Sequence, residues 1–237
     1  STRDRALNEW QIRLGLVAEE RASSVRQWVA AQFGELAGIA ENASAQIYLG
    51  AADASSDTSD PAALAERQYL ENLLAITAER GGFLPQAPRS QVRANVSRPG
   101  VAGLALLNKA GRPIAATSDL PPLEGELATF LRDASAAGER TIWPMRPGPT
   151  GTAVMGFYQP MYAALGLAEG SERIGAVFGV KEAGPALFDL LRDPVPIIAT
   201  GRSLLLRHEE DGNIRVLSPV DNTFGPLDLA LSDERTR

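Results

Sequence analysis

The side chains best suited to bind a small ligand lie in the second half of the chain, in and around short apolar segments. Lys181 is one of only two lysines and follows an apolar run at residues 173–180. A partly buried ammonium is costly unless it is paired, and an anionic ligand would provide that pairing. A solvent-exposed lysine, or one paired with Glu182, is the alternative.

Two tyrosines and an Arg–Trp–Arg group add further candidates. Tyr158 and Tyr162 are an even number of residues apart, so both face the same way on a strand. Their hydroxyls would orient a ligand in a mostly apolar pocket, or they belong to aromatic core residues. Arg140 and Arg146 flank Trp143. Arginine binds carboxylates through two parallel hydrogen bonds, although a solvated strand edge would also explain both arginines.

Two hydroxyl side chains complete the predicted site. Thr117 and Ser118 follow a predicted hairpin and could donate to an anion, or they serve turn and cap chemistry. The predicted ligand-binding residues are therefore Lys181, Tyr158, Tyr162, Arg140, Trp143, Arg146, Thr117 and Ser118.

Catalytic motifs are missing from the sequence. It has no Gly-rich phosphate loop, no nucleophile elbow and no His-Glu-x-x-His pattern. Cysteine is absent, and the only histidine, His208, lies in a predicted hairpin. Most nucleophile–base pairs and thiolate metal sites are therefore unavailable. We predict no catalytic residue, metal or cofactor, and keep a hydrolase acting through carboxylates as a remote alternative.

Composition is that of a folded, mildly acidic protein. The 237 residues are 44% hydrophobic and 22% charged, with a net charge of −6. This acidity argues against binding nucleic acid, which calls for a basic surface. The sequence contains neither a run of roughly 18 apolar residues, as a membrane span requires, nor a signal peptide. Because a helical pattern is already under way at Ser1, we expect a fragment of a longer polypeptide.

A long helix is predicted at the start of the chain. The first fifty residues carry one uninterrupted amphipathic pattern, with apolar residues at Leu7, Trp10, Leu14 and Val17 and no proline. Fifty helical residues span about 75 Å, so this helix needs a partner surface or forms a stalk. We expect it to end near Gly50.

Shorter elements follow. Asp60 and Pro61 predict the start of a second helix, which Gly81 and Gly82 end. Further elements are expected as a hairpin at 101–107 and 113–117, a helix at 123–137, strands at 140–145, 153–162 and 173–180, a short helix at 185–191, and a second hairpin at 203–207 and 213–217.

Five antiparallel strands with a helix between the second and third resemble a PAS-like fold, and the preceding long helix narrows the resemblance to the Cache family of extracellular sensor domains. Residues 106–118 look like the first hairpin of the family, 157–162 like its pocket-lining strand and 174–181 like its last strand. Residues 201–213 resemble the opening hairpin of a second module.

Departures from the family pattern bear on the ligand. Amine-binding members carry an Arg-x-Trp-Tyr block and a terminal Asp. Here Trp143 is followed by Pro144 and Met145, so the Tyr of that block is missing, and Lys181 stands in place of the terminal Asp. The resemblance therefore implies an anionic ligand, as in the dicarboxylate-sensing kinases of the family.

We expect an α+β fold in which the long helix packs on a PAS-like five-stranded antiparallel sheet, followed by a partial or small second module. The expected domains are a stalk helix and linker at 1–59, a membrane-distal Cache module at 60–194 and a membrane-proximal module at 195–237.

The function implied by the resemblance is periplasmic ligand sensing in a bacterial transmembrane receptor, namely a histidine kinase, diguanylate cyclase or chemoreceptor. The expected partners are a small-molecule ligand such as an organic acid, and a second copy bound through the N-terminal helix. Membrane spans are expected outside the chain. The alternative is a protein-interaction and dimerisation module without a small-molecule ligand.

Overall fold

A computed structural model describes residues 2–54, 60–85, 100–149, 151–163, 172–192, 202–220 and 224–232. The chain divides into two compact units. The larger, the sheet unit, comprises Gln32–Glu182, and the smaller comprises Ser1–Ala31 with Ala183–Arg237.

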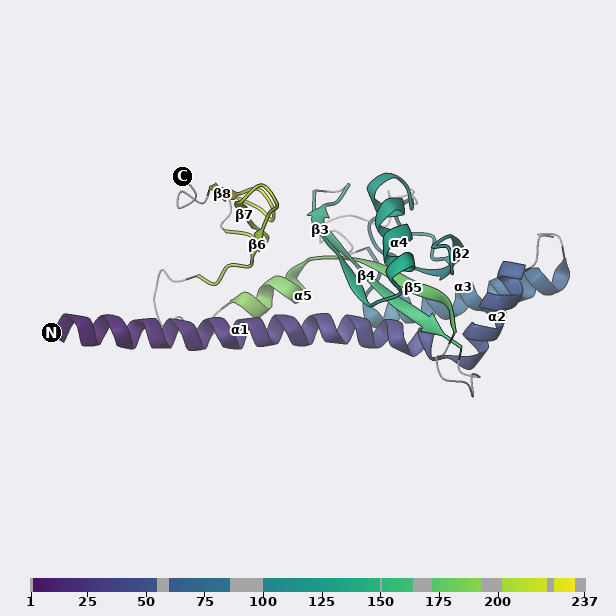
Figure 1. Ribbon diagram of the computed structural model, residues 1–237, viewed down its shortest axis with the longest axis horizontal. Helices are drawn as coiled ribbons and strands as arrows, with labels where there is room; N and C mark the ends of the chain where they lie inside the picture. The colour runs from purple at the N-terminus through teal and green to yellow at the C-terminus, as the bar shows by residue number, and fades with distance from the viewer. Residues whose placement is uncertain are drawn as a thin grey trace, which may run out of the picture. The chain divides into compact units, whose positions relative to one another are not determined.

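Two helices open the chain in place of the single one predicted. Helix α1 spans Thr2–Ala40 and α2 spans Ala43–Ala54 (Figure 1). Between them, the side-chain oxygen of Asn42 accepts a hydrogen bond from the Ala45 N–H at 2.9 Å, as an N-cap does. The prediction of an uninterrupted helix was wrong because this asparagine offers the backbone a local partner that competes with helix continuation.

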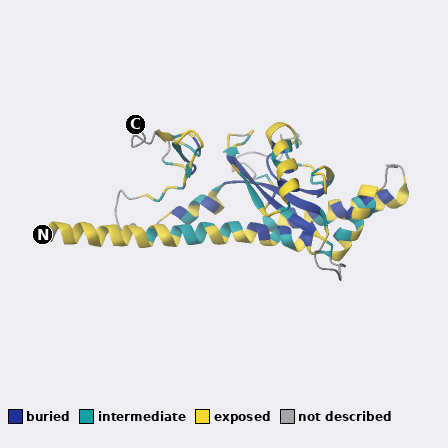
Figure 2. Ribbon diagram, in the orientation of Figure 1, coloured by how far each residue is buried: buried dark blue, intermediate teal, exposed yellow. Residues whose placement is uncertain are grey.

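Burial along α1 changes with position. In its last turns Phe33, Leu36 and Ile39 are buried, whereas Leu7 and Leu14 are 54% and 52% exposed. Figure 2 shows the change from exposed to buried along this helix. The sequence pattern is continuous, but only its second half contributes to the core of the sheet unit.

Helix α3, Pro61–Gly81, confirms the predicted capping signals. The Asp60 carboxylate accepts from the Ala62 N–H at 3.1 Å. Gly82 ends the helix in the left-handed conformation at φ 68°, which glycine adopts without steric cost.

The described residues of the sheet unit form one antiparallel five-stranded sheet, and this confirms the predicted α+β class. Its strand order is β2-β1-β5-β4-β3. The strands are β1 Gly103–Asn108, β2 Pro113–Ala116, β3 Thr141–Pro147, β4 Ala153–Tyr162 and β5 Arg173–Glu182. Helix α4, Gly125–Ala137, connects β2 to β3, so both the predicted hairpin and the predicted three-strand meander are present.

An asparagine organises the hairpin. The side-chain oxygen of Asn108 accepts from the backbone N–H groups of Ala110 and Arg112 at 3.1 and 3.0 Å. Its side-chain nitrogen donates to Asp53 at 2.8 Å, which ties the turn to the end of α2. This buried amide therefore joins elements that are 55 residues apart.

Helices cover both faces of the sheet. On one face Leu127, Leu131 and Ala134 of α4 pack with sheet residues such as Tyr158 and Phe178. On the other face, the rings of Phe33 from α1 and Phe83 contact Phe157 edge-on, with centroids 5.4 and 6.3 Å away. Alternation along β4 and β5 sends successive side chains to opposite helices.

The smaller unit holds a short helix and a second sheet. Helix α5, Pro185–Phe188, is followed by the 3-10 turn η1, Asp189–Leu191. The described part of the sheet has the order β6-β7-β8, with β6 Leu206–His208, β7 Asn213–Val216 and β8 Ala230–Ser232. The predicted hairpin is confirmed, and β8 is an additional strand that the sequence pattern did not indicate.

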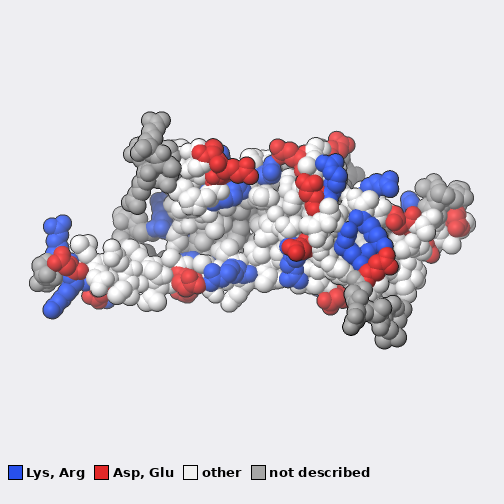
Figure 3. Space-filling view, in the orientation of Figure 1, with Lys and Arg blue, Asp and Glu red and all other residues white. Residues whose placement is uncertain are grey.

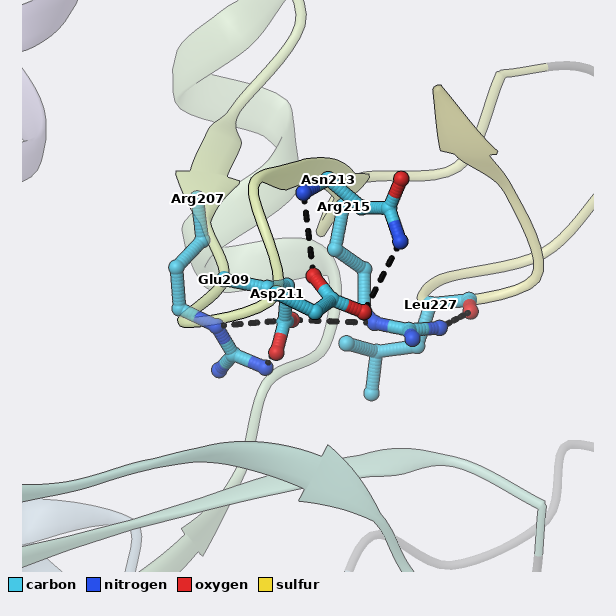
Figure 4. A network of polar contacts seen from close by, with 6 residues as sticks. All are labelled: Arg207, Glu209, Asp211, Asn213, Arg215 and Leu227. Carbon is cyan, nitrogen blue, oxygen red and sulfur yellow. Dashed lines mark hydrogen bonds and ion pairs between the residues drawn. The ribbon is translucent and has the colours of Figure 1, made fainter. Parts of the chain in front are cut away.

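A polar network stabilises this hairpin (Figure 4). The Glu209 carboxylate accepts from Arg207 at 2.8 Å and from Arg215 at 3.0 Å. The hydrogen bond from Arg207 is the largest of the influences that lower the pKa of Glu209. Arg215 also donates to the backbone carbonyl of Leu227 at 3.3 Å. Every charged group in this network is paired within the unit, so we assign it a structural role.

Candidate functional site

A β-bulge in β3 brings two of the predicted ligand-binding residues to one face. Trp143 pairs with Gly156 of β4, and Arg146 pairs with Val154, so between these pairs two residues of β3 oppose one of β4. On a regular strand, residues three apart would face opposite ways. The bulge re-aims the second side chain, and the Arg146 guanidinium carbon lies 5.3 Å from the centre of the Trp143 ring.

This pair carries two buried hydrogen-bond donors with no acceptor among the described residues. They are the indole nitrogen of Trp143 and the Nε of Arg146. An unsatisfied buried donor costs about 1–3 kcal/mol, and native proteins leave few of them unpaired. The Nε of Arg67 is unsatisfied in the same way, so what distinguishes this pair is that both of its donors lie on side chains in cation–π contact and could share one acceptor.

The start of α4 supplies the surroundings of the pair. Arg146 forms an ion pair with Glu126 in the first turn of α4. The N-cap residue Glu124 makes no side-chain hydrogen bond to the helix. The positive end of a helix dipole and a guanidinium both favour negative charge. We call Trp143, Arg146 and Glu126 the Trp143–Arg146 site.

Both predicted tyrosines donate to α4 or its cap. The Tyr158 hydroxyl donates to the side chain of buried Ser135 at 3.1 Å. The Tyr162 hydroxyl donates to the backbone carbonyl of Gly138 at 2.7 Å. Tyr158 is fully buried and Tyr162 is 41% exposed. Both lie on the α4 side of the sheet, and each hydroxyl already has a protein acceptor.

Lys181 and Arg140 lie on the other side of the sheet. The Lys181 ammonium donates to the side-chain oxygen of Gln32 and to the Gly81 carbonyl, both at 2.7 Å. The Arg140 guanidinium stands 4.8 Å from the centre of the Phe33 ring and donates to Gln159 at 2.9 Å. The sheet therefore separates Lys181 and Arg140 from the Trp143–Arg146 site, and one small ligand cannot contact both groups.

Burial lowers the pKa of Lys181, and the nearby Glu35 carboxylate partly opposes this shift. Lys181 is half-buried, and its ammonium donates to an amide oxygen and to a backbone carbonyl. Its own strand neighbour, Glu182, is buried as well.

The two predicted hydroxyl residues, Thr117 and Ser118, have different surroundings. The Thr117 hydroxyl accepts from the Leu104 N–H at 3.0 Å, which closes the β1–β2 hairpin. Ser118 is exposed at the next position. Thr117 is therefore occupied by turn chemistry, the alternative that the sequence had left open.

Sequence reasoning missed the groups that complete these environments. Glu126 and Ser135 belong to α4, and Gln32 and Gly81 lie more than 99 residues before their partner Lys181. The signal available for the Trp143–Arg146 pair was Pro144. A proline inside a strand indicates an edge or a bulge, and a bulge at that point changes which side chains share a face.

Charge and metal-ligand patterns give no further indication of a site. Among the described residues, no group of three or more His, Cys, Asp or Glu side chains is placed to hold a metal ion. On the face drawn in Figure 3, acidic and basic side chains of the described residues are interspersed over the sheet unit. Within the same described ranges, no helix combines the length and apolarity needed to span a bilayer.

Comparison with known protein families, curated proteins and solved structures finds no significant match to this chain.

Proposed function

We propose that the chain is the ligand-sensing domain of a bacterial transmembrane signalling receptor, of the Cache type and located in the periplasm. Its ligand is a small carboxylate bound at the Trp143–Arg146 site. The fold supports the proposal because a long helix precedes five antiparallel strands with a helix between the second and third. This is the arrangement on which the resemblance to Cache domains rests.

The observation that carries the ligand class is the pair of unsatisfied donors. A carboxylate supplies two acceptor oxygens and a negative charge, which would suit the Nε of Arg146 and the indole N–H of Trp143. Charge-assisted hydrogen bonds to arginine are about twice as strong as neutral ones.

A thermal-shift screen against small organic acids tests this proposal. A ligand that binds only the folded state raises the melting temperature, and at least one acid should do so. Trp143→Phe keeps the ring but removes the indole donor, so it should reduce that shift. Trp28→Phe is the matched control, because Trp28 lies in α1, outside both this site and the exposed start of that helix. An identical shift in the Trp143→Phe protein would refute the site.

A second candidate function, self-association, is favoured by the exposed apolar side chains of α1. Leu7, Trp10 and Leu14 are spaced by three and four residues, so they share one face of the helix. They are 54%, 41% and 52% exposed. The stripe would be buried by the same stripe of a second copy.

Sedimentation over a range of concentrations tests self-association. Leu14→Glu should shift the population towards monomer, because it places a charge inside the stripe. Ile12→Glu is the control, since Ile12 is also exposed but projects from the opposite side of the helix. Equal behaviour of the two variants would exclude the stripe as an interface.

A further inference from the structure

Lys181 bonds to two helices from the end of a strand. It is the penultimate residue of β5. Its ammonium donates at 2.7 Å to the Gln32 side chain of α1 and at 2.7 Å to the carbonyl of Gly81, the last residue of α3. It also lies 5.0 Å from the centre of the Phe83 ring. We call Lys181, Gln32 and the Gly81 carbonyl the Lys181 clasp.

The clasp lies where the chain enters and leaves the sheet unit. Gln32 is the first residue of that unit and Lys181 the last but one. They are 149 residues apart in the sequence, yet one direct hydrogen bond joins the two side chains. A displacement of α1 that reaches the sheet unit would therefore act close to this hydrogen bond.

The charged form of Lys181 carries a cost of burial. Burial disfavours its charged form, with Glu35 as the opposing influence, and replacing buried charges by apolar side chains is often neutral or stabilising. An ammonium at this position holds its two acceptors in a fixed position, because it bonds to both of them. Its acceptors belong to α1 and α3, so both helices are held to the end of β5, and α1 is held through a side chain.

Lys181 directly follows the residue of β5 that lies in the same cross-strand row as Trp143. Trp143 pairs with Gly156, and Gly156 pairs with Val180 of β5. Val180 belongs to the core on the α4 side, and the next side chain, Lys181, projects to the other face. A shift of β5 at this row would move both side chains together.

We propose that the Lys181 clasp fixes the last turns of α1 to the end of β5 and passes displacements of that strand to the helix. The anchoring holds whatever the ligand is, whereas the transmission of a ligand signal rests on the proposed function.

Hydrogen exchange of the ligand-free protein tests the anchoring. Lys181→Met keeps the length of the side chain and removes its donors. Exchange of the α1 amides after Gln32 should become about five- to tenfold faster, the effect of losing one net hydrogen bond, while exchange in α4 stays unchanged. Lys109→Met is the control, because Lys109 pairs with Glu172 at the surface.

The outcomes separate clearly. Unchanged exchange in α1 would overturn the clasp, and so would an equal increase in α1 and α4, which would mean that Lys181 contributes only to global stability. If Lys181→Met does not fold, Gln32→Met, which leaves the bond to Gly81, is judged by the same criteria.

A second arm separates the clasp from the ligand hypothesis. An acid that raises the melting temperature should change α1 exchange in the wild type and leave it unchanged in Lys181→Met. If no acid binds, the proposed function fails while the first arm still decides on the clasp. If an acid binds and changes α1 exchange equally in both proteins, the transmission through Lys181 is refuted.

Discussion

Arg146 stacks on Trp143 across a bulge, with the guanidinium carbon 5.3 Å from the ring centre. The stacking is a cation–π contact, and it leaves the Nε of Arg146 and the indole N–H buried without an acceptor among the described residues. If β3 paired regularly with β4 here, Arg146 would lie opposite Ala153 and its side chain would project from the opposite face of the sheet. The site therefore depends on backbone irregularity as much as on residue type.

Glu126 is expected to compete with the ligand. Its carboxylate pairs with Arg146, so Glu126→Gln should tighten carboxylate binding about threefold, in line with the modest strength of an exposed ion pair. Calorimetric titration at low ionic strength measures this. Glu124→Gln is the control, because Glu124 makes no side-chain hydrogen bond to α4. Weaker binding by Glu126→Gln would show that Glu126 assists the ligand.

The buried tyrosine is expected to contribute to stability. Tyr158→Phe removes the hydrogen bond to Ser135 and should lower the free energy of unfolding by about 1 kcal/mol. Tyr162→Phe changes a solvent-exposed contact and should cost less than about 0.5 kcal/mol. Urea unfolding of both variants measures the difference. Equal losses would contradict the assignment of Tyr158 to the core.

Two glycines should respond oppositely to alanine. A Cβ on Gly175 would lie 2.2 Å from the Leu107 carbonyl oxygen, so Gly175→Ala should destabilise by about 1–3 kcal/mol. A Cβ on Gly50 meets nothing within 4 Å, and Gly50→Ala inside α2 should stabilise by about 0.5–1 kcal/mol. Thermal unfolding of the two variants checks both signs, and a stable Gly175→Ala protein would contradict the packing of β5 on β1.

Alkaline pH should favour the wild type over Lys181→Met. Burial lowers the pKa of Lys181 in the folded state, so between the folded and unfolded pKa the unfolded chain binds more protons. The free energy of unfolding then rises with pH, and the cost of burying the charge disappears. Urea unfolding from roughly pH 8 to pH 10, below the ordinary lysine value, gives the difference between the two proteins. A difference that is flat or falls with pH would contradict the burial of the charge.

Local signals in the sequence were enough for most of the fold. Asp60 with Pro61, Gly82, and Asn108 each act within a few residues, so their effects can be anticipated from spacing alone. The break at Asn42 was missed because the apolar periodicity continues past this residue, and the prediction gave that periodicity more weight than a single capping residue. The strand β8 was missed because three residues carry too little pattern to distinguish them from a loop.

The composition of the site was harder to anticipate. Trp143 and Arg146 were predicted as candidates, but their common face follows from a bulge that alternation does not reveal. Lys181 was grouped with them, although strand alternation already sends it away from its neighbour Val180. Its partners Gln32 and Gly81 come from other elements far away in the sequence, and no local pattern contains that information.

The indole N–H resonances of the protein test the carboxylate site most directly. The chain has three tryptophans, and Trp143→Phe identifies which resonance belongs to Trp143. Titration with an organic acid that raises the melting temperature should shift the Trp143 resonance downfield as its N–H gains an acceptor, while Trp10 and Trp28 stay in place. A Trp143 resonance that does not move at saturating acid would contradict the proposal that this donor binds the ligand.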